Sequence, residues 1–275
     1  MVNHPRLIVF TDLHGTLLDQ ITHSFRASLP AVRKLQSLKM PVVLCSKKTR
    51  AEVEPLWREL SLEEPYIFEN GGAICFTPGR FPFEAETARS DSKLNIIELG
   101  ARIGELRAGL TEVARRLHIR VRFFADMNAK DIVEFTGLTR QQAQAAAQRE
   151  YDEAFLIDEP SREHMLTTAL RMKGFTVTRG ERFFHLSRGS DKGKAARLLA
   201  ERYRRNGDAW VTVGLGNSAN DLPLLLAVDR PILIRNPDRS WDSTITQSIP
   251  GIRKTMSIGP EGWAESVEKL LTEIA

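Results

Sequence analysis

The stretch Leu7-Ile8-Val9-Phe10-Thr11-Asp12-Leu13-His14-Gly15-Thr16 decides the fold of this 275-residue chain. Its apolar and β-branched beginning predicts a buried strand over residues 7–11. Asp12 then stands at the carboxyl end of that strand, where open α/β sheets bind their ligands. A carboxylate followed by a Gly-Thr turn is suited to attacking a phosphoryl group and to holding a metal. His14 occupies a place where we would expect a second carboxylate.

The composition is typical of a soluble globular protein, with 42% hydrophobic and 27% charged residues. No apolar run approaches the roughly 20 residues that a membrane span needs. The N-terminal residues lead directly into the first strand, so we expect no secretory signal. Cys45 and Cys75 lie in apolar runs, which favours buried free thiols over a disulfide. These features predict a cytoplasmic protein without a membrane partner.

The chain is mildly basic, with a formal net charge of +4. Its basic residues are scattered among acidic ones, and the pairs and clusters at 115–116 and 202–205 fall on helical patterns. Such charges are typical of solvated helix faces, so we expect no nucleic-acid partner. A mild positive bias also suits a small anionic substrate.

Strand and helix patterns alternate at both ends of the chain. This alternation predicts a doubly wound parallel sheet of the α/β class. The predicted strands cover residues 7–11, 41–45, 66–68, 210–215 and 231–234, and the predicted helices cover 28–38, 50–60, 191–205, 219–227 and 262–274.

The middle of the chain has a different pattern. It mixes helices with short strands, which indicates an α+β insert within the α/β domain. We therefore predict a core formed by residues 1–83 and 187–275 and an inserted cap domain formed by 84–186. The predicted cap helices cover residues 98–117, 139–147 and 159–173, and its strands cover 154–157, 176–178 and 182–186.

Four separated pieces of sequence carry the candidate chemistry. Each has an ordinary structural explanation, such as a helix cap, a solvated lysine or a tight turn. Their order, with predicted strands before them, instead favours one site assembled at the strand ends. The pieces are Asp12, Ser46 after the second strand, Lys192 at a helix start, and the glycine-rich turn from Gly214 to Asp221.

These residue types fit phosphoryl transfer through a covalent intermediate. A carboxylate nucleophile, Asp12, splits phosphate hydrolysis into two steps. A phosphomonoester carries about two negative charges that repel it, so a hard cation such as Mg²⁺ is needed. Lys192 adds positive charge, and Ser46 adds hydrogen bonds. Asn217 and Asp221 supply further oxygen ligands. No phosphate-binding loop of the Gly-x-x-x-x-Gly-Lys-Ser/Thr type occurs, and the first strand does not end in a glycine-rich dinucleotide turn.

The chain resembles the haloacid dehalogenase superfamily of aspartyl-phosphate phosphatases over essentially its whole length. More narrowly it resembles the mannosyl-3-phosphoglycerate phosphatase family, which has a class IIB cap. The segments that carry this resemblance beyond the four pieces are 43–50, 68–72, 134–138, 149–155 and 259–263.

The resemblance implies a role for each piece. Asp12 is the nucleophile, Ser46 is the second motif and Lys192 the third. The Mg²⁺ ligands are Asp12, the backbone carbonyl of residue 14, and the turn that holds Asn217 and Asp221. The family pattern has an Asp at position 14, which protonates the leaving oxygen, and an acidic ligand at position 217. This chain has His14 and Asn217 instead.

Two functions are compatible with these departures. In the first, the protein is a Mg²⁺-dependent phosphatase that converts mannosyl-3-phosphoglycerate, or a relative such as glucosyl-3-phosphoglycerate, to the glycosylglycerate. His14 would then act as general acid, since an ordinary histidine titrates near pH 6.5. In the second, the protein is a catalytically impaired or non-enzymatic binder of a phosphorylated sugar acid, because the missing carboxylates weaken Mg²⁺ binding.

Candidate substrate contacts are less specific. Cationic side chains near the second motif suit a substrate carboxylate, and charged cap residues suit sugar hydroxyls or the glycerate. Each could equally be a solvated or salt-bridged surface group, and residues 69–72 could be a hairpin turn. The candidates are Lys48, Arg50, Asn70, Gly71, Arg149, Glu150, Asp152 and Glu153. Four further histidines, His23, His118, His164 and His185, have no metal-ligand spacing and are expected to be structural or solvated.

Overall fold

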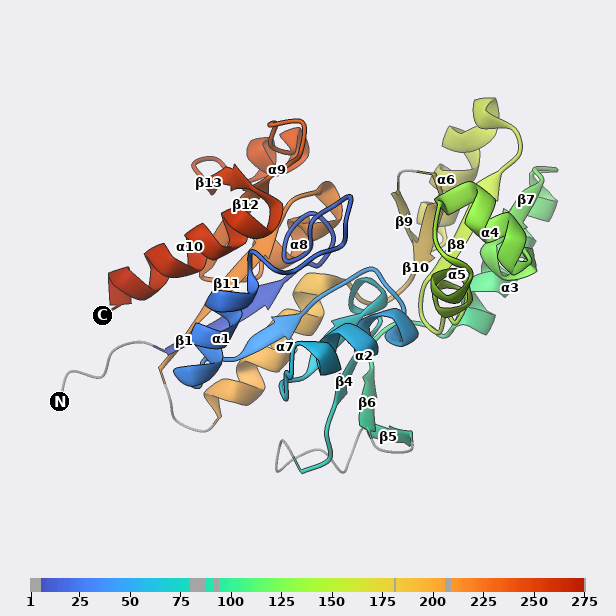
Figure 1. Cartoon of the computed structure of the whole chain (residues 1–275). Coiled ribbons are helices and arrows are strands. Elements are labelled where there is room, and N and C mark those ends of the chain that lie inside the picture. The colour runs from blue at the N-terminus through green and yellow to red at the C-terminus, as the bar shows by residue number, and fades with distance from the viewer. Residues whose placement is uncertain (1–5, 80–87, 92–93, 181, 206–208, 275) are drawn as a thin grey trace.

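The computed structural model describes residues 6–79, 88–91, 94–180, 182–205 and 209–274. Two lobes are visible in Figure 1, and the chain passes from the first to the second and back. The first lobe is built on a parallel five-stranded sheet with the order β13-β12-β11-β1-β2. Its strands are β1 (Arg6–Thr11), β2 (Val42–Leu44), β11 (Trp210–Gly216), β12 (Arg230–Arg235) and β13 (Arg253–Ile258).

Helices cover both faces of this sheet, because alternate residues of β1 enter two different apolar clusters. Leu7 and Val9 pack with α1, α2 and α10, whereas Ile8 and Phe10 pack with α7 and α8. The predicted doubly wound α/β fold is thereby confirmed. The helices of this lobe are α1 (Leu29–Ser37), α2 (Arg50–Glu59), α7 (Lys192–Arg204), α8 (Leu222–Leu225), α9 (Ser243–Ser248) and α10 (Gly259–Ile274).

A second, antiparallel sheet extends from the edge of the first. It has the order β3-β4-β6-β5, and the amide of Ser46 at the end of β2 donates to the carbonyl of Ile67 in β3 at 3.0 Å. The predicted helix over 98–117 was wrong at its start, because the apolar, β-branched run before Glu98 forms β6 instead. The strands are β3 (Tyr66–Phe68), β4 (Ala73–Phe76), β5 (Ala88–Asp91) and β6 (Leu94–Glu98).

The second lobe has an antiparallel sheet with the order β7-β8-β10-β9. Helices α3 and α6 pack on one face of it, and α4 and α5 share an apolar cluster with Ala154 and Phe183. The predicted α+β insert is confirmed, while its first predicted boundary, near residue 84, falls outside the described residues. The elements are α3 (Ile103–Arg116), β7 (Val121–Phe123), α4 (Ala129–Thr136), α5 (Arg140–Ala146), β8 (Glu153–Ile157), α6 (Glu163–Met172), β9 (Thr176–Arg179) and β10 (Phe184–Ser187).

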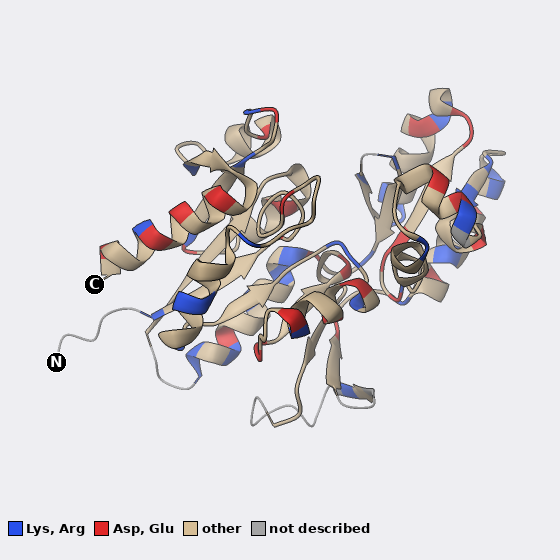
Figure 2. Cartoon of the chain, in the orientation of Figure 1, with Lys and Arg blue, Asp and Glu red and all other residues tan. Residues whose placement is uncertain are grey.

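Three bulk properties complete the description. Cys45 and Cys75 are buried and free, as predicted. Within the described ranges, no helix combines the length and apolar character needed to cross a membrane. Both signs of charge occur on both lobes, as Figure 2 shows.

Candidate active site

A cleft of about 290 Å³ lies where the parallel strands of the core end and the cap begins. The core contributes residues from three of the four predicted pieces, and the cap contributes the β9–β10 region. Lys192, the fourth piece, is not among the lining residues but contacts Asp12. The residues used below are Asp12, His14, Ser46, Lys47, Lys48, Asn70, Asn217 and Asn236 from the core, and Thr178, Gly180 and His185 from the cap.

Lys192 joins two of the predicted pieces directly. Its Nζ donates to Oδ1 of Asp12 at 2.7 Å and to Oδ1 of Asp221 at 2.6 Å, and the lysine side chain is only 1% exposed. Burial alone would lower the pKa of Lys192, but the two carboxylates outweigh it and raise that pKa. The ammonium is therefore charged and fixed beside the predicted nucleophile.

The turn at Gly71 sets the position of Lys192. Gly71 has a φ of +87°, and a Cβ on it would lie 2.2 Å from the carbonyl oxygen of Asp191. The hydroxyl of Ser190 also donates to the Gly71 carbonyl at 2.6 Å. Asp191 then caps α7 by accepting from the amide of Lys194. Glycine at position 71 is thus what lets the start of α7 approach this turn.

Ser46 follows β2 and is 2% exposed. Its hydroxyl accepts from the amide of Lys48 at 3.2 Å. It does not cap α2, because Thr49 does so in a reciprocal capping box with Glu52. The capping explanation for Ser46 is therefore excluded, and the residue lines the cleft instead.

Two sets of contacts hold the loop after β1. Trp263 donates through Nε1 to the Thr11 hydroxyl at 2.9 Å, and that hydroxyl donates to the Asp12 carbonyl at 2.7 Å. His14 lines the cleft, and its ring lies 5.1 Å from the ring of His23. The aromatic neighbour His23 was not predicted as part of this site.

The glycine-rich turn holds Asp221 behind the cleft. Oδ2 of this buried carboxylate accepts from the amides of Asn217 at 3.0 Å and Ser218 at 3.2 Å. Burial and the neighbouring charge of Asp12 raise the pKa of Asp221. A Cβ on Gly216 would lie 2.5 Å from the Cβ of Asp221, so a glycine is needed for this close turn.

The amide of Asn217 is oriented by two neighbours. Its Oδ1 accepts from Thr16 at 3.2 Å, and its Nδ2 donates to Oδ1 of Asn236 at 2.9 Å. Asn236 also donates to the Asn217 carbonyl. Asn236 was not predicted, because it lies at the end of β12 without a motif around it.

The donor set of this cleft suits a hard cation. All of its candidate ligands, the carboxylates of Asp12 and Asp221, the amide of Asn217 and the carbonyl of His14, are oxygens. In the part of the chain that the structure describes, no three His, Cys, Asp or Glu side chains gather as a metal cluster. The oxygen donors therefore fit a hard cation such as Mg²⁺, with two carboxylates and the neutral Asn217 among the candidate ligands.

The predicted substrate contacts separate into two groups. Lys48 and Asn70 line the cleft, and Arg149 lines an adjoining cavity of about 340 Å³ that shares His14, Lys48 and His185 with it. Lys48 also forms an ion pair with Glu52.

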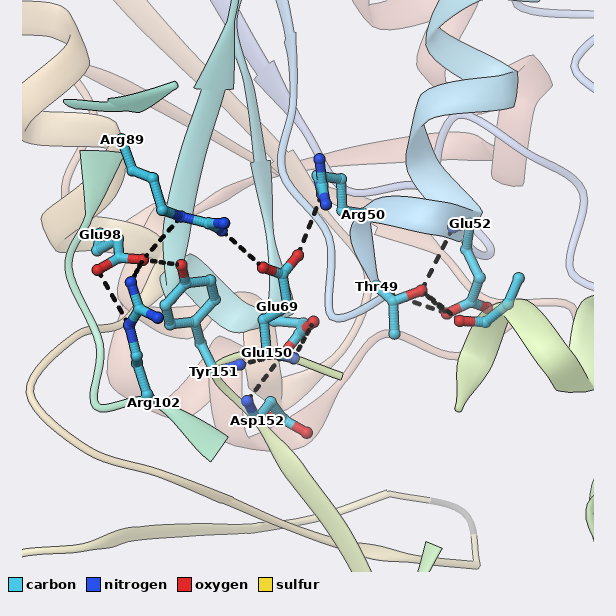
Figure 3. A network of polar contacts seen from close by, with 11 residues as sticks. Thr49, Arg50, Glu52, Glu69, Arg89, Glu98, Arg102, Glu150, Tyr151 and Asp152 are labelled. Atoms are coloured by element: carbon cyan, nitrogen blue, oxygen red, sulfur yellow. Dashed lines mark hydrogen bonds and ion pairs between the residues drawn. The ribbon is translucent and has the colours of Figure 1, made fainter. Parts of the chain in front are cut away.

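Other predicted substrate contacts form ion pairs with protein side chains. Arg50 pairs with Glu150 at 3.1 Å, and Glu150 pairs with Arg89 at 2.9 Å (Figure 3). Glu153 is fully buried and pairs with Arg107. The ion-pair explanation therefore describes both Arg50 and Glu153.

His185 is a second cleft residue, after Asn236, that the sequence interpretation missed. It was expected to be isolated, but its Nδ1 lies 2.7 Å from Oδ1 of Asp152. The two residues are 33 positions apart and meet only through the pairing of β8 with β10. No sequence spacing could have indicated this contact.

Comparison with known proteins agrees with the fold. The model of the haloacid dehalogenase-like hydrolases matches residues 9–243, and the chain belongs to this family. It is a phosphatase, so the prediction of an enzyme is confirmed.

More narrowly, two relatives are named glucosyl-3-phosphoglycerate/mannosyl-3-phosphoglycerate phosphatase. The protein of Methanococcoides burtonii is 37% identical over 96% of this chain and 97% of its own length. That of Persephonella marina is 35% identical over 98% of both chains. Among solved structures, BT1666 from Bacteroides thetaiotaomicron has a TM-score of 0.69 at 15% identity and covers 98% of this chain and 96% of its own.

Proposed function

We propose that this phosphatase is Mg²⁺-dependent and hydrolyses mannosyl-3-phosphoglycerate to mannosylglycerate and phosphate, with glucosyl-3-phosphoglycerate as the related alternative substrate. The names of the two relatives support this substrate class. The observation that carries the mechanism is the buried contact of Lys192 with both Asp12 and Asp221.

The reaction has two balanced steps. A carboxylate oxygen of Asp12 bonds to phosphorus, the bond from phosphorus to the glycerate oxygen breaks, and His14 gives its proton to that leaving oxygen. Water then hydrolyses the aspartyl phosphate, which releases phosphate and restores the carboxylate; the proton of that water returns to His14. Lys192 and Ser46 bind the phosphoryl oxygens throughout.

Mg²⁺ held by Asp12, the His14 carbonyl, Asn217 and Asp221 would offset the repulsion between the nucleophile and the phosphate. Lys48, Asn70 and Arg149 would contact the remainder of the substrate, since they line the cleft and its adjoining cavity. Gly71 would act by placing Lys192, and Arg50 and Glu153 by their ion pairs behind the cleft.

The direct test is phosphate release from mannosyl- and glucosyl-3-phosphoglycerate, with Mg²⁺ and with a chelator. We expect phosphate release in the assay with Mg²⁺ and none in the assay with the chelator. The mannosyl compound should give the higher kcat/KM. Asp12→Asn should lower kcat by about a thousandfold or more while leaving the fold intact. Tight binding of either compound without release would overturn the proposal, and equal rates in the chelator would overturn its metal dependence.

A further inference from the structure

His185 lines the active-site cleft from the cap side. It lies on β10, opposite Ala154 of β8 and Thr178 of β9. It lines both the cleft that contains Asp12 and the adjoining cavity that contains Arg149. Its side chain is 12% exposed, so most of the ring is packed against protein.

A buried carboxylate fixes the orientation of this ring. Oδ1 of Asp152 lies 2.7 Å from Nδ1 of His185 and accepts from Arg149 at 2.7 Å, while Oδ2 accepts from Asn70 at 2.9 Å. Burial would raise the pKa of Asp152, but the charges of His185 and Arg149 outweigh it and lower that pKa to about 2. Asp152 is therefore ionised, and it requires a proton on Nδ1 of His185.

The opposite nitrogen, Nε2, faces Gly180. A Cβ on Gly180 would lie 3.3 Å from Nε2, and Gly180 itself lines the cleft. The absence of a side chain at position 180 leaves space beside Nε2. Because Nδ1 contacts Asp152, Nε2 is the ring nitrogen that remains to bind a ligand.

The surroundings favour an anionic ligand at that atom. Lys47 and Lys48 line the cleft together with His185, and Arg149 donates to the same oxygen of Asp152 that His185 contacts. Two acidic side chains, Asp12 and Asp242, also line the cleft, and Asp12 pairs with Lys192. Glu52 lines the adjoining cavity and pairs with Lys48. A ring with both nitrogens protonated donates to Asp152 and to a carboxylate at the same time.

We infer that His185 is a specificity-determining residue whose Nε2–H binds the carboxylate of the glycerate group, with Asp152 as its positioning residue. This inference rests on the proposed function, since it assigns a place to one part of that substrate. In this arrangement the phosphate group lies at Asp12 and Lys192. His185 of the cap binds the carboxylate, which a glycerate has and a glycerol lacks.

A substrate pair tests the assignment. Phosphate release is measured for the glycosyl-3-phosphoglycerate and for the matching glycosyl glycerol phosphate, which lacks the carboxylate. For His185→Gln we expect KM for the acid to rise about ten- to a hundredfold, since a hydrogen bond to a charged group contributes about 1.5–3 kcal/mol. Its kcat for the acid, and both constants for the neutral analogue, should stay within about threefold of wild type.

Two further variants separate a local effect from a structural one. His164→Gln changes an exposed cap histidine and should leave all constants unchanged. Asp152→Asn keeps the shape of the side chain but removes its charge, and it should raise KM for the acid without adding to the effect of His185→Gln in the double variant.

The outcomes are distinct. An equal loss on both substrates would show that His185 serves the fold or a sugar hydroxyl, and an unchanged KM for the acid would show that it does not contact the substrate; either result overturns the inference. Failure of the wild-type protein to hydrolyse either compound would instead overturn the proposed function.

Discussion

At the scale of single residues, the proposed mechanism depends on Lys192 and its two carboxylate partners. Removing one member of a buried ion pair leaves an uncompensated charge, which commonly costs about 3–5 kcal/mol. In the proposed reaction, the same ammonium that is balanced by Asp12 and Asp221 also binds the phosphoryl oxygens. Asp12 lies 180 positions from Lys192 in the chain, and the fold brings them to 2.7 Å.

The substitution His14→Asp tests the acid at position 14. The wild-type kcat should fall as the solution becomes alkaline, because an imidazolium loses its proton near neutral pH and can no longer protonate the leaving oxygen. His14→Asp should move the alkaline limb of the kcat–pH profile. Superimposable profiles for the two proteins would show that His14 is not the acid.

Asn217→Asp tests the neutral residue in the proposed metal site. An added carboxylate increases the negative charge around Mg²⁺, so the Mg²⁺ concentration for half-maximal activity should fall about tenfold. The variant loses the hydrogen bond from Nδ2 to Asn236, and a modest loss of stability is expected with it.

Asn220→Asp is a matched control for this experiment, because it adds the same charge to the same turn. Asn220 already has its Oδ1 bonded to the Ser218 hydroxyl, and its substitution should change the Mg²⁺ requirement much less. If Asn217→Asp leaves the requirement unchanged, residue 217 is not a ligand.

At the scale of elements, the turn between β3 and β4 connects the core to the cap through hydrogen bonds. The carboxylate of Glu69 is fully buried and accepts from the amides of residues 150, 151 and 152, with a shortest distance of 2.6 Å (Figure 3). Asn70, the next residue, donates to Asp152. One short turn thus holds the chain where it enters β8 and also supports the His185–Asp152 pair.

Glu69 makes stability depend on pH. Burial raises its pKa to about 7, despite the opposing charge of Arg149. The folded protein therefore holds this proton more tightly than the unfolded chain, so its stabilising effect is present below about pH 4.5 and is lost as the pH rises through 7. Urea unfolding at pH 5.5 and 8 should show wild type losing free energy of unfolding relative to Glu69→Gln over this interval. A constant difference between the two proteins would contradict the assignment.

Strands and helices were predicted well where the order of apolar and polar residues within the segment is itself characteristic of a strand or a helix. The strand ends that hold Asp12 and Ser46 were placed by apolar runs of β-branched residues. The segments that form β4, β6, α4 and β13 were not predicted. Their apolar residues depend on the sheet or helix beside them, as when β6 pairs with β4 through Ile97 and Ile74.

At the scale of the whole molecule, the cleft belongs to both lobes. The core contributes Asp12, Ser46 and Asn217 to its lining, and the cap contributes His185 and Gly180. Beyond the Glu69 turn, a hydrogen bond from Thr49 to the carbonyl of Ala145 and the ion pair of Arg50 with Glu150 connect the two lobes. Most of the core half of the site was predicted from the sequence because Asp12, Ser46 and the turn that holds Asn217 each follow a strand of one parallel sheet. The cap half was not, because antiparallel pairing joins residues without a characteristic spacing.

Binding of the products should therefore affect both lobes. We expect hydrogen exchange of backbone amides to slow severalfold at residues 46–49 and at 176–180 together when glycosylglycerate, phosphate and Mg²⁺ are added. The reason is that ligands filling the cleft contact both of its walls and exclude water from them. Slowed exchange in the core segment alone would show that the cap does not take part in binding.

The central claim, transfer of the phosphoryl group to Asp12, is tested most directly by rapid mixing with substrate, acid quenching and mass spectrometry of the peptides. The account predicts one phosphoryl group on the peptide that contains Asp12, formed and lost within a single turnover and absent in Asp12→Asn. Release of glycosylglycerate in the first turnover, with no phosphoryl group on that peptide at any quench time, would contradict it.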